Sequence, residues 1–484
     1  MITFIISVAV LVAGYFIYGG YVDRNFKSDQ TRPTPAIEKN DGVDYVPLKT
    51  SKIFLIQFLN IAGLGPIFGA IAGAMWGPVA FIWIVLGSVF AGGVHDYFSG
   101  MLSVRHEGES IPEIVGKYLG VGVKNFMRIF ALVLLILVGV VFVKGPATIL
   151  AGLSGVKAFY WIFIIFLYYI LATMIPIDKL IGKIYPFFGG SLLVMAVGIF
   201  AVLLFGNYSI PDLTPSTFSN MHANPGKFPV FPMLFITIAC GAISGFHSTQ
   251  SPLMARCLSN EADGKKIFYG AMITEGIVAL IWAAAAMAFF GGVRELGETM
   301  AQPGHNAAWV VNQICDTMLG KIGGLLAIIG VVAAPITSGD TAFRSARLTI
   351  ADTFNFKQGK LVQRLVITIP IFIVAIMLTT INFDIIWRYF GWSNQTLATI
   401  VLWTASVYML IRGENFWIAL IPAIFMSAVV TTYILVAPEG LMLPYSLSVF
   451  IGCVVTIILA GYFFFLRSKK VVPGRLKKSS VRSN

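Results

Sequence analysis

The sequence predicts an all-α polytopic membrane protein with about 13 transmembrane helices, because only helices or closed barrels satisfy their backbone groups inside a bilayer. Of its 484 residues, 57% are hydrophobic and only 12% are charged, against about 25% charged in ordinary soluble domains. The apolar residues form long blocks, and a block of about 20 is enough to cross the hydrocarbon core. The four cysteines are scattered without a CxxC pair. These observations exclude a soluble enzyme, a disordered chain and a disulfide scaffold.

The expected helices follow the apolar blocks in order along the chain. They lie near residues 2–20, 53–76, 79–103, 128–150, 158–176, 184–206, 230–252, 267–291, 322–342, 365–381, 392–411, 415–437 and 445–466. The first block has no basic leading segment and no small-residue cleavage site, so we expect a retained helix rather than a removed signal peptide.

Lys and Arg are distributed unequally between the two sides of this arrangement. Alternate segments that include the C-terminal tail carry 28 of the 34 basic residues, and the other side carries 6. Basic residues are enriched in cytoplasmic loops, so we expect a cytoplasmic C-terminus and an N-terminus outside the inner (plasma) membrane. The net charge of +12 then needs no nucleic-acid partner. The basic tail is typical of an anchor on anionic membrane lipid, with a regulatory tail as the alternative.

Two helices look unsuited to being continuous. Gly63, Gly65 and Pro66 fall near the middle of the block 53–76, where Gly and Pro weaken a helix. The alternative is close helix packing by small residues, since Gly69 and Gly73 fit a small-xxx-small pattern. The block 230–252 has only a short apolar part, and its second half carries a run of polar side chains from Ser244 to Ser251. Either this run is merely a helix end, or it lies partly within the bilayer.

The two interrupted helices are expected to run in opposite directions. Paired Gly/Pro-interrupted helices indicate a transporter built from inverted repeats, with its substrate site at the bilayer midplane. Exposed N–H ends of half-helices attract anions, so a carboxylate substrate is expected there. The candidate substrate-binding residues are Gly63, Gly65, Gly241, Ser244, Gly245, His247, Ser248 and Thr249.

A third group of polar residues lies in the block 322–342. Thr337 and Ser338 offer adjacent hydroxyls, and Pro335 frees the Ala334 carbonyl. Hydroxyl and carbonyl oxygens suit a small hard cation such as Na⁺, so these residues are a candidate sodium site. The alternative is that both hydroxyls bond back to their own helix.

Ionisable residues within membrane segments are functional candidates by default. His95 and Asp96 are either a packing pair at the cytoplasmic rim or a proton carrier and inner gate. His247 lies at the second interruption and can titrate near neutral pH. Glu275 is either buried and protonated or paired with a basic residue. Asp340 and Arg344 are spaced as an i, i+4 ion pair, with an inner gate as their other role.

At these residues the sequence resembles the carbon starvation protein A (CstA) family of transporters. The resemblance is carried by AGLGPIFGAIAGAMWG (62–77), GSVFAGGVHDYFSGMLSVRHEG (87–108), ACGAISGFH (239–247) and DTAFRSARLTIAD (340–352). It implies a LeuT-like 5+5 inverted-repeat core with one extra N-terminal and two extra C-terminal helices. It also implies a sodium site in which Thr337, Ser338 and Ala334 face backbone carbonyls near Ala62–Gly65.

This resemblance implies the following organisation. Residues 1–52 form an N-terminal helix and cytoplasmic linker, 53–206 the first repeat, 207–411 an extracellular loop and the second repeat, and 412–484 two helices and the basic tail. The implied function is ion-coupled import of a small carboxylate, pyruvate or a short peptide, linked to nutrient scavenging. The coupling ion, Na⁺ or H⁺, stays open, as does the oligomeric state.

Other classes of function are less well supported by the sequence. It shows no HExxH motif or nucleophile–base pair for a membrane enzyme, and no GxxxxGK[ST] loop for ATP. We therefore expect no enzyme activity and no cofactor. A channel or nutrient sensor without coupled transport is the alternative, and saturable, ion-dependent flux would separate it from a symporter.

Overall fold

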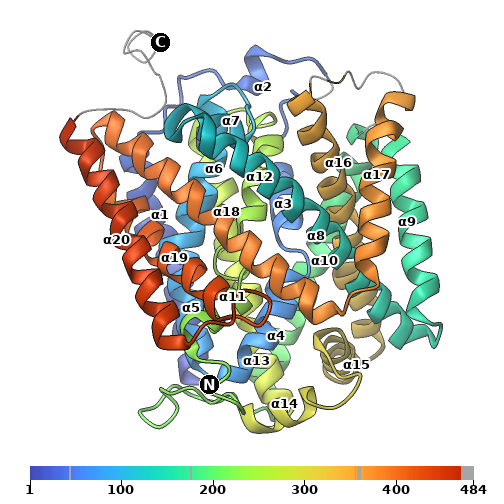
Figure 1. Cartoon of the computed structure of the whole chain (residues 1–484). Helices are drawn as coiled ribbons and strands as arrows, with labels where there is room; N and C mark the ends of the chain where they lie inside the picture. Colours follow the sequence, from blue (N-terminus) through green and yellow to red (C-terminus); the bar gives the residue numbers. More distant parts are fainter. Residues whose placement is uncertain (43–44, 175–176, 355, 357–360, 470–484) are drawn as a thin grey trace.

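The computed structural model describes residues 1–42, 45–174, 177–354, 356 and 361–469, and these contain helices and loops but no β-strand (Figure 1). In this part of the chain, ten helices are long and apolar enough to cross a membrane, or eleven if a bent pair counts as one span. The expected all-α polytopic class is therefore confirmed, while the count of 13 stays a prediction.

The long helices follow the apolar blocks of the sequence. They are α1 (Ile2–Phe26), α8 (Val121–Ser154), α9 (Ala158–Met174), α10 (Ile177–Phe205), α13 (Gly270–Phe289), α15 (Ala307–Leu326), α16 (Ala334–Phe354), α17 (Leu361–Thr379), α18 (Phe383–Arg412), α19 (Trp417–Val436) and α20 (Tyr445–Lys469). In addition, α5 (Val79–Leu86) continues through a wider helical turn, Gly87–Gly92, into α6 (Gly93–Arg105). Short helices cover the two faces of the bundle: α2 (Pro35–Glu38), α7 (Ile111–Leu119) and α14 (Val293–Met300).

The N-terminus and α14 lie at one face of the bundle, and α2, α7 and the end of α20 lie at the opposite face (Figure 1). We call these the N-terminal face and the C-terminal face. The linker after α1 is held at the C-terminal face, where Leu48 N–H donates to the Cys257 carbonyl and Thr50 donates to Asp263. It is thus packed against the loop that leads to α13.

The first expected interruption is present. α3 (Thr50–Ile61) ends before Ala62, and the helical segment Gly65–Trp76, which contains α4 (Ala70–Gly73), leaves it at a bend of 54°. Both Gly63 and Gly65 are also sites of close packing. A Cβ at Gly63 would lie 2.6 Å from the Phe142 ring, and one at Gly65 would lie 2.2 Å from Cys240 Cβ. The break and the close packing therefore occur together.

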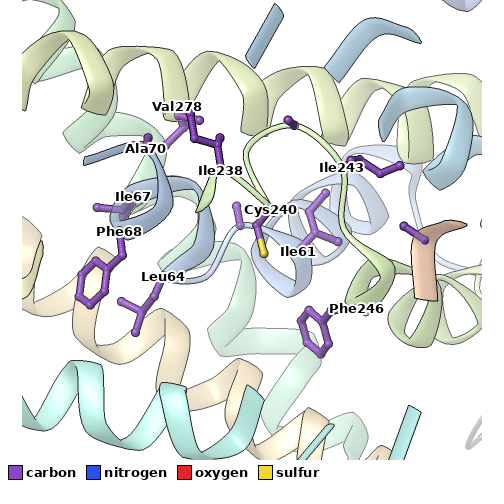
Figure 2. Close-up of a cluster of buried hydrophobic side chains, with 14 of the residues drawn as sticks. Ile61, Leu64, Ile67, Phe68, Ala70, Ile238, Cys240, Ile243, Phe246 and Val278 are labelled. Carbon is purple, nitrogen blue, oxygen red and sulfur yellow. The ribbon is translucent and has the colours of Figure 1, made fainter. Parts of the chain in front are cut away.

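The second interruption is longer than the first. Helical turns over Val230–Leu234 and α11 (Phe235–Thr237) end at Ile238, and α12 (Gly245–Ala255) starts only after Ser244, whose backbone is extended. The polar run from Ser244 to Ser251 therefore forms the start of a new helix inside the bundle, since Ser244, His247, Ser248 and Ser251 are buried. Figure 2 shows the non-helical segment around Cys240 lying beside the break after Ile61.

The helix expected at 322–342 differs most from the structure. α15 precedes it, Gly320 turns the chain with φ 59° and ψ −148°, and α16 continues to Phe354. Glycine adopts this left-handed conformation without a Cβ penalty. α16 thus runs past the expected end of the block at 342 and carries the Asp340–Arg344 ion pair within it.

Candidate functional site

Asp96 is the centre of a polar cluster inside the bundle. Its Oδ1 lies 2.7 Å from His95 Nδ1, and its Oδ2 lies 2.8 Å from His247 Nδ1. All three side chains are completely buried. One carboxylate therefore links α6 to the first turn of α12, directly beside the second break.

Glu275 on α13 extends this cluster. Its Oε2 lies 3.4 Å from His247 Nε2, on the opposite side of the imidazole from Asp96. Within the described residues, neither carboxylate oxygen of Glu275 has a hydrogen-bond partner, although the side chain is fully buried. No Lys or Arg in this part of the chain forms an ion pair with Asp96 or Glu275.

Two buried carboxylates without a Lys or Arg partner need another source of positive charge or a proton. An uncompensated buried charge costs several kcal/mol, so such groups pair with cations or take up protons. Here His95 and His247 are the basic groups in contact with the carboxylates. The arrangement can therefore hold one or more protons at a discontinuous helix.

Cys240 lies close to the same groups. Its Sγ, a ring nitrogen of His247 and a carboxylate oxygen of Glu275 all lie within 4.8 Å of one another. The sulfur, however, accepts a hydrogen bond from Asn394 Nδ2 at 3.3 Å and lies 3.5 Å from Ser244 Oγ. We therefore interpret Cys240 as part of the hydrogen-bonded lining of the break.

Asn394 on α18 is the functional candidate that the sequence analysis missed. Its Oδ1 accepts hydrogen bonds from Phe246 N–H at 2.6 Å and from Ser244 Oγ at 3.0 Å. Its Nδ2 donates to Cys240. The side chain thus joins both sides of the second break. The sequence signal was the polar run Ser393–Thr396 at the start of the expected helix 392–411.

The other candidate substrate residues fall into two groups. Gly241 and Gly245 allow close approach of neighbouring helices: a Cβ at Gly241 would lie 2.5 Å from Ala279 Cβ, and one at Gly245 would lie 2.4 Å from the Asn394 carbonyl. Ser248 and Thr249 donate to Gly245 and Phe246 carbonyls of their own helix. In this structure, their hydroxyls are therefore engaged within α12.

The candidate sodium residues lie where α16 faces the first break. Ser338 Oγ lies 3.2 Å from the Leu59 carbonyl and 3.2 Å from the Ala334 carbonyl, and Thr337 Oγ1 donates to Ala334 at 2.6 Å. The carbonyl opposite Ser338 belongs to Leu59, one turn before the expected Ala62. Both hydroxyls thus bond to a carbonyl of their own helix, which was the alternative to a sodium site.

Asp340 and Arg344 form the i, i+4 ion pair at 3.3 Å, and Arg344 also donates to the Ala172 carbonyl. They lie on the part of α16 that runs to the C-terminal face, away from the cluster around Asp96. The structure thus brings His95, Asp96 and His247 together with Glu275, and it leaves Asp340 and Arg344 as a separate pair.

A cavity of 420 Å³ opens above the two breaks on the side of the N-terminal face. Phe68 and Thr237, which belong to the two interrupted helices, line it together with Trp387 and Arg388 of α18. The rings of Phe68 and Trp387 lie 5.8 Å apart. Because Thr237 is the last residue of α11, this cavity reaches the side of the second break that faces the N-terminal face.

Comparison with known proteins is consistent with this geometry. The family model described as carbon starvation protein CstA matches residues 1–154, 146–319 and 291–433. The chain belongs to the CstA family. A membrane protein of Haemophilus influenzae is 46% identical over 350 residues, covering 62% of this chain and 94% of the relative.

Relatives with named functions are more distant. The peptide transporter CstA and the pyruvate/proton symporter BtsT of Escherichia coli are each 29% identical, over 59% and 58% of this chain. The matches cover 50% and 48% of these relatives, so the chain aligns with about half of their length. Among solved structures, a manganese transporter of Eremococcus coleocola has a TM-score of 0.52 at 13% identity, covering 90% of this chain and 98% of that one.

Several expectations from the sequence are thereby confirmed. The CstA resemblance is correct, the chain shares the fold of the manganese transporter, and it is a multi-pass membrane transporter rather than an enzyme. A small-molecule solute is the partner that these relatives support.

Proposed function

We propose that the chain is a proton-coupled symporter that imports a small carboxylate, pyruvate or a short peptide, across the inner membrane by alternating access. The observation that carries this proposal is His247, whose ring lies between two fully buried carboxylates, Asp96 and Glu275, at a helix break. The name of the relative BtsT, a pyruvate/proton symporter, supports the same coupling ion.

Coupling between the proton and the solute follows from the charge of the cluster around His247. The titratable groups that face His247 are His95 and Asp96 from α6, Glu275 from α13 and Cys240 from the second break. A proton on this cluster reduces its negative charge, which lowers the repulsion felt by an anionic solute at the adjacent break. Proton and carboxylate then favour each other's binding, and they cross together when one helix bundle rocks against the other.

The solute is proposed to bind where the two breaks meet. The first turn of α12 offers backbone N–H groups and the Ser244 hydroxyl, which are donors suited to a carboxylate. The orientation expected from basic residues places the N-terminal face, with its 420 Å³ cavity, outside the cell. The two inverted repeats, 53–206 and 207–411, would be the bodies that exchange access.

Uptake into proteoliposomes tests this proposal. The full chain is reconstituted, and accumulation of radiolabelled pyruvate and of a dipeptide is measured under inward H⁺ or Na⁺ gradients. We expect H⁺ alone to drive accumulation, by up to about tenfold per pH unit for one proton. Glu275→Gln should abolish accumulation against a gradient yet permit exchange, and Glu298→Gln, at an exposed residue of α14, is the matched control.

Two results would contradict the proposal. Accumulation driven only by Na⁺ would move the coupling site to Thr337 and Ser338. Flux without gradient-driven accumulation would favour the channel or sensor.

A further inference from the structure

Asn394 occupies the hydrogen-bond donors that an anionic solute would need. The start of α12 presents Phe246 N–H and the Ser244 hydroxyl, and both donate to Asn394 Oδ1, at 2.6 Å and 3.0 Å. The side chain is completely buried. An amide oxygen is therefore held where a carboxylate oxygen would be bound by the same two donors.

A second observation marks the same place as a binding site. His247 Nε2, in the first turn of α12, is fully buried and makes no hydrogen bond among the described residues; it lies 3.4 Å from Glu275 Oε2, and that carboxylate is likewise buried without a hydrogen bond. A ring nitrogen of His247 and a carboxylate oxygen of Glu275 also lie within 4.8 Å of Cys240 Sγ, which itself contacts Asn394 and Ser244. Buried polar atoms without hydrogen bonds are costly, so the His247–Glu275 pair indicates groups that are satisfied in another state of the transporter.

The contact between α18 and α12 is direct at this point. A Cβ at Gly245 would lie 2.6 Å from Ala398 N and 2.4 Å from the Asn394 carbonyl, so the backbones of the two helices touch. Gln395, the next residue on α18, donates to the Phe235 carbonyl on the other side of the break. A movement of α18 therefore withdraws Asn394 from the donors of α12.

We propose that Asn394 is a positioning and specificity residue whose side-chain oxygen takes the place of the substrate carboxylate at the start of α12 and is replaced by it during transport. This inference rests on the proposed function and assigns it a substrate class, because a carboxylate outcompetes a neutral amide for these donors. Charge-assisted hydrogen bonds are about twice as strong as neutral ones.

Two substitutions at Asn394 should act in opposite directions on affinity. Asn394→Ala removes the internal competitor, so we expect pyruvate to bind about fivefold more tightly. Asn394→Asp places a permanent carboxylate on the same donors, so we expect binding at least about tenfold weaker. A purely structural role of Asn394 predicts weaker binding for both variants.

These affinities are measured by equilibrium binding to the purified full chain in lipid nanodiscs. The probes are radiolabelled pyruvate and a dipeptide, with pyruvamide and the dipeptide amide as neutral competitors. Thr404→Val, at another buried residue of α18 that bonds within its own helix, is the matched control. If Asn394→Ala fails to fold, Asn394→Leu, which has the same branching at Cγ and cannot accept a hydrogen bond, replaces it.

The outcomes separate this inference from the proposed function. Wild-type protein that binds and accumulates a carboxylate, with both Asn394 variants weakened alike or unchanged, overturns the role of Asn394 alone. Equal competition by the neutral amides also overturns it. Wild-type protein that binds neither carboxylate probe contradicts the proposed function, and this inference with it.

Discussion

His247 Nδ1 and Asp96 Oδ2 lie 2.8 Å apart although the two residues are separated by 151 positions in the chain. This bond joins α6 to the first turn of α12, and the chain just before that turn is extended rather than helical. The ring's other nitrogen points to Glu275, 3.4 Å away. A protonation change at His247 therefore acts at once on α6, α12 and α13, and these helices meet at the second break.

Asp96→Asn tests whether the charge of this carboxylate is needed. The substitution preserves size but removes the anionic acceptor shared by His95 and His247, so a proton on His247 loses its nearest stabilising charge. We expect proton-driven accumulation of pyruvate to be lost, and the pH dependence of exchange in proteoliposomes to flatten.

Asp316→Asn, at an exposed residue of α15, is the control and should behave as wild type. Unchanged accumulation in Asp96→Asn would show that His95 and Asp96 are only a packing pair.

Thr337→Val and Ser338→Ala test the alternative coupling ion. Both hydroxyls are engaged with backbone carbonyls, Thr337 with Ala334 and Ser338 with Ala334 and Leu59. Because such hydrogen bonds contribute about 1 kcal/mol each, we expect lower stability but proton-driven uptake within about twofold of wild type. Uptake that requires Na⁺ in the wild type, and is lost in either variant, would establish a sodium site instead.

The two breaks were predictable from sequence, whereas the polar cluster beside the second break was only partly predictable. Gly63, Gly65 and Pro66 disrupt a helix locally, and polar residues from Ser244 onward are unsuited to lipid, so both breaks leave a compositional signal. The contact of Asp96 with His247, and of His247 with Glu275, depends on how α6, α12 and α13 pack. The residue pattern within one helix does not predict which side chains of other helices it will contact.

Asn394 illustrates the same limit. In sequence it belongs to the polar run Ser393–Thr396 at the start of an expected helix, and its own role appears only where α18 meets the start of α12. The Asp340–Arg344 pair, by contrast, lies within one helix, and its i, i+4 spacing was visible in the sequence.

Gly65→Ala tests the contact between the two breaks. A Cβ at Gly65 would lie 2.2 Å from Cys240 Cβ, too close for two non-bonded carbon atoms, so one break must move. Overpacking of this kind costs about 1–3 kcal/mol. We expect a lower unfolding temperature and a strong loss of uptake, measured by thermal unfolding and proteoliposome assay.

Gly122→Ala is the control, because a Cβ at this helical glycine meets nothing within 4 Å. It should be neutral or slightly stabilising, since alanine favours a helix over glycine by about 1 kcal/mol. Equal stability of the two variants would mean that the breaks are not packed as described.

Glu261→Gln tests the ion pair that closes the C-terminal face. Arg105 Nε lies 2.5 Å from Glu261 Oε1, and the two side chains are 6% and 0% exposed. Arg105 also donates to the Lys27 carbonyl, and Glu261 accepts from Asp29 N–H, so the pair holds the linker after α1. Removing one partner of a buried pair leaves an uncompensated charge and costs about 3–5 kcal/mol.

We therefore expect Glu261→Gln to lower the unfolding temperature and to speed proteolysis of the linker. Glu298→Gln breaks a pair with Arg294 in which the side chains are 62% and 84% exposed, so its cost should stay below about 1 kcal/mol. If the two variants were equally stable, the Arg105–Glu261 pair would not hold the linker. Faster transport in Glu261→Gln would show, in addition, that opening this face limits turnover.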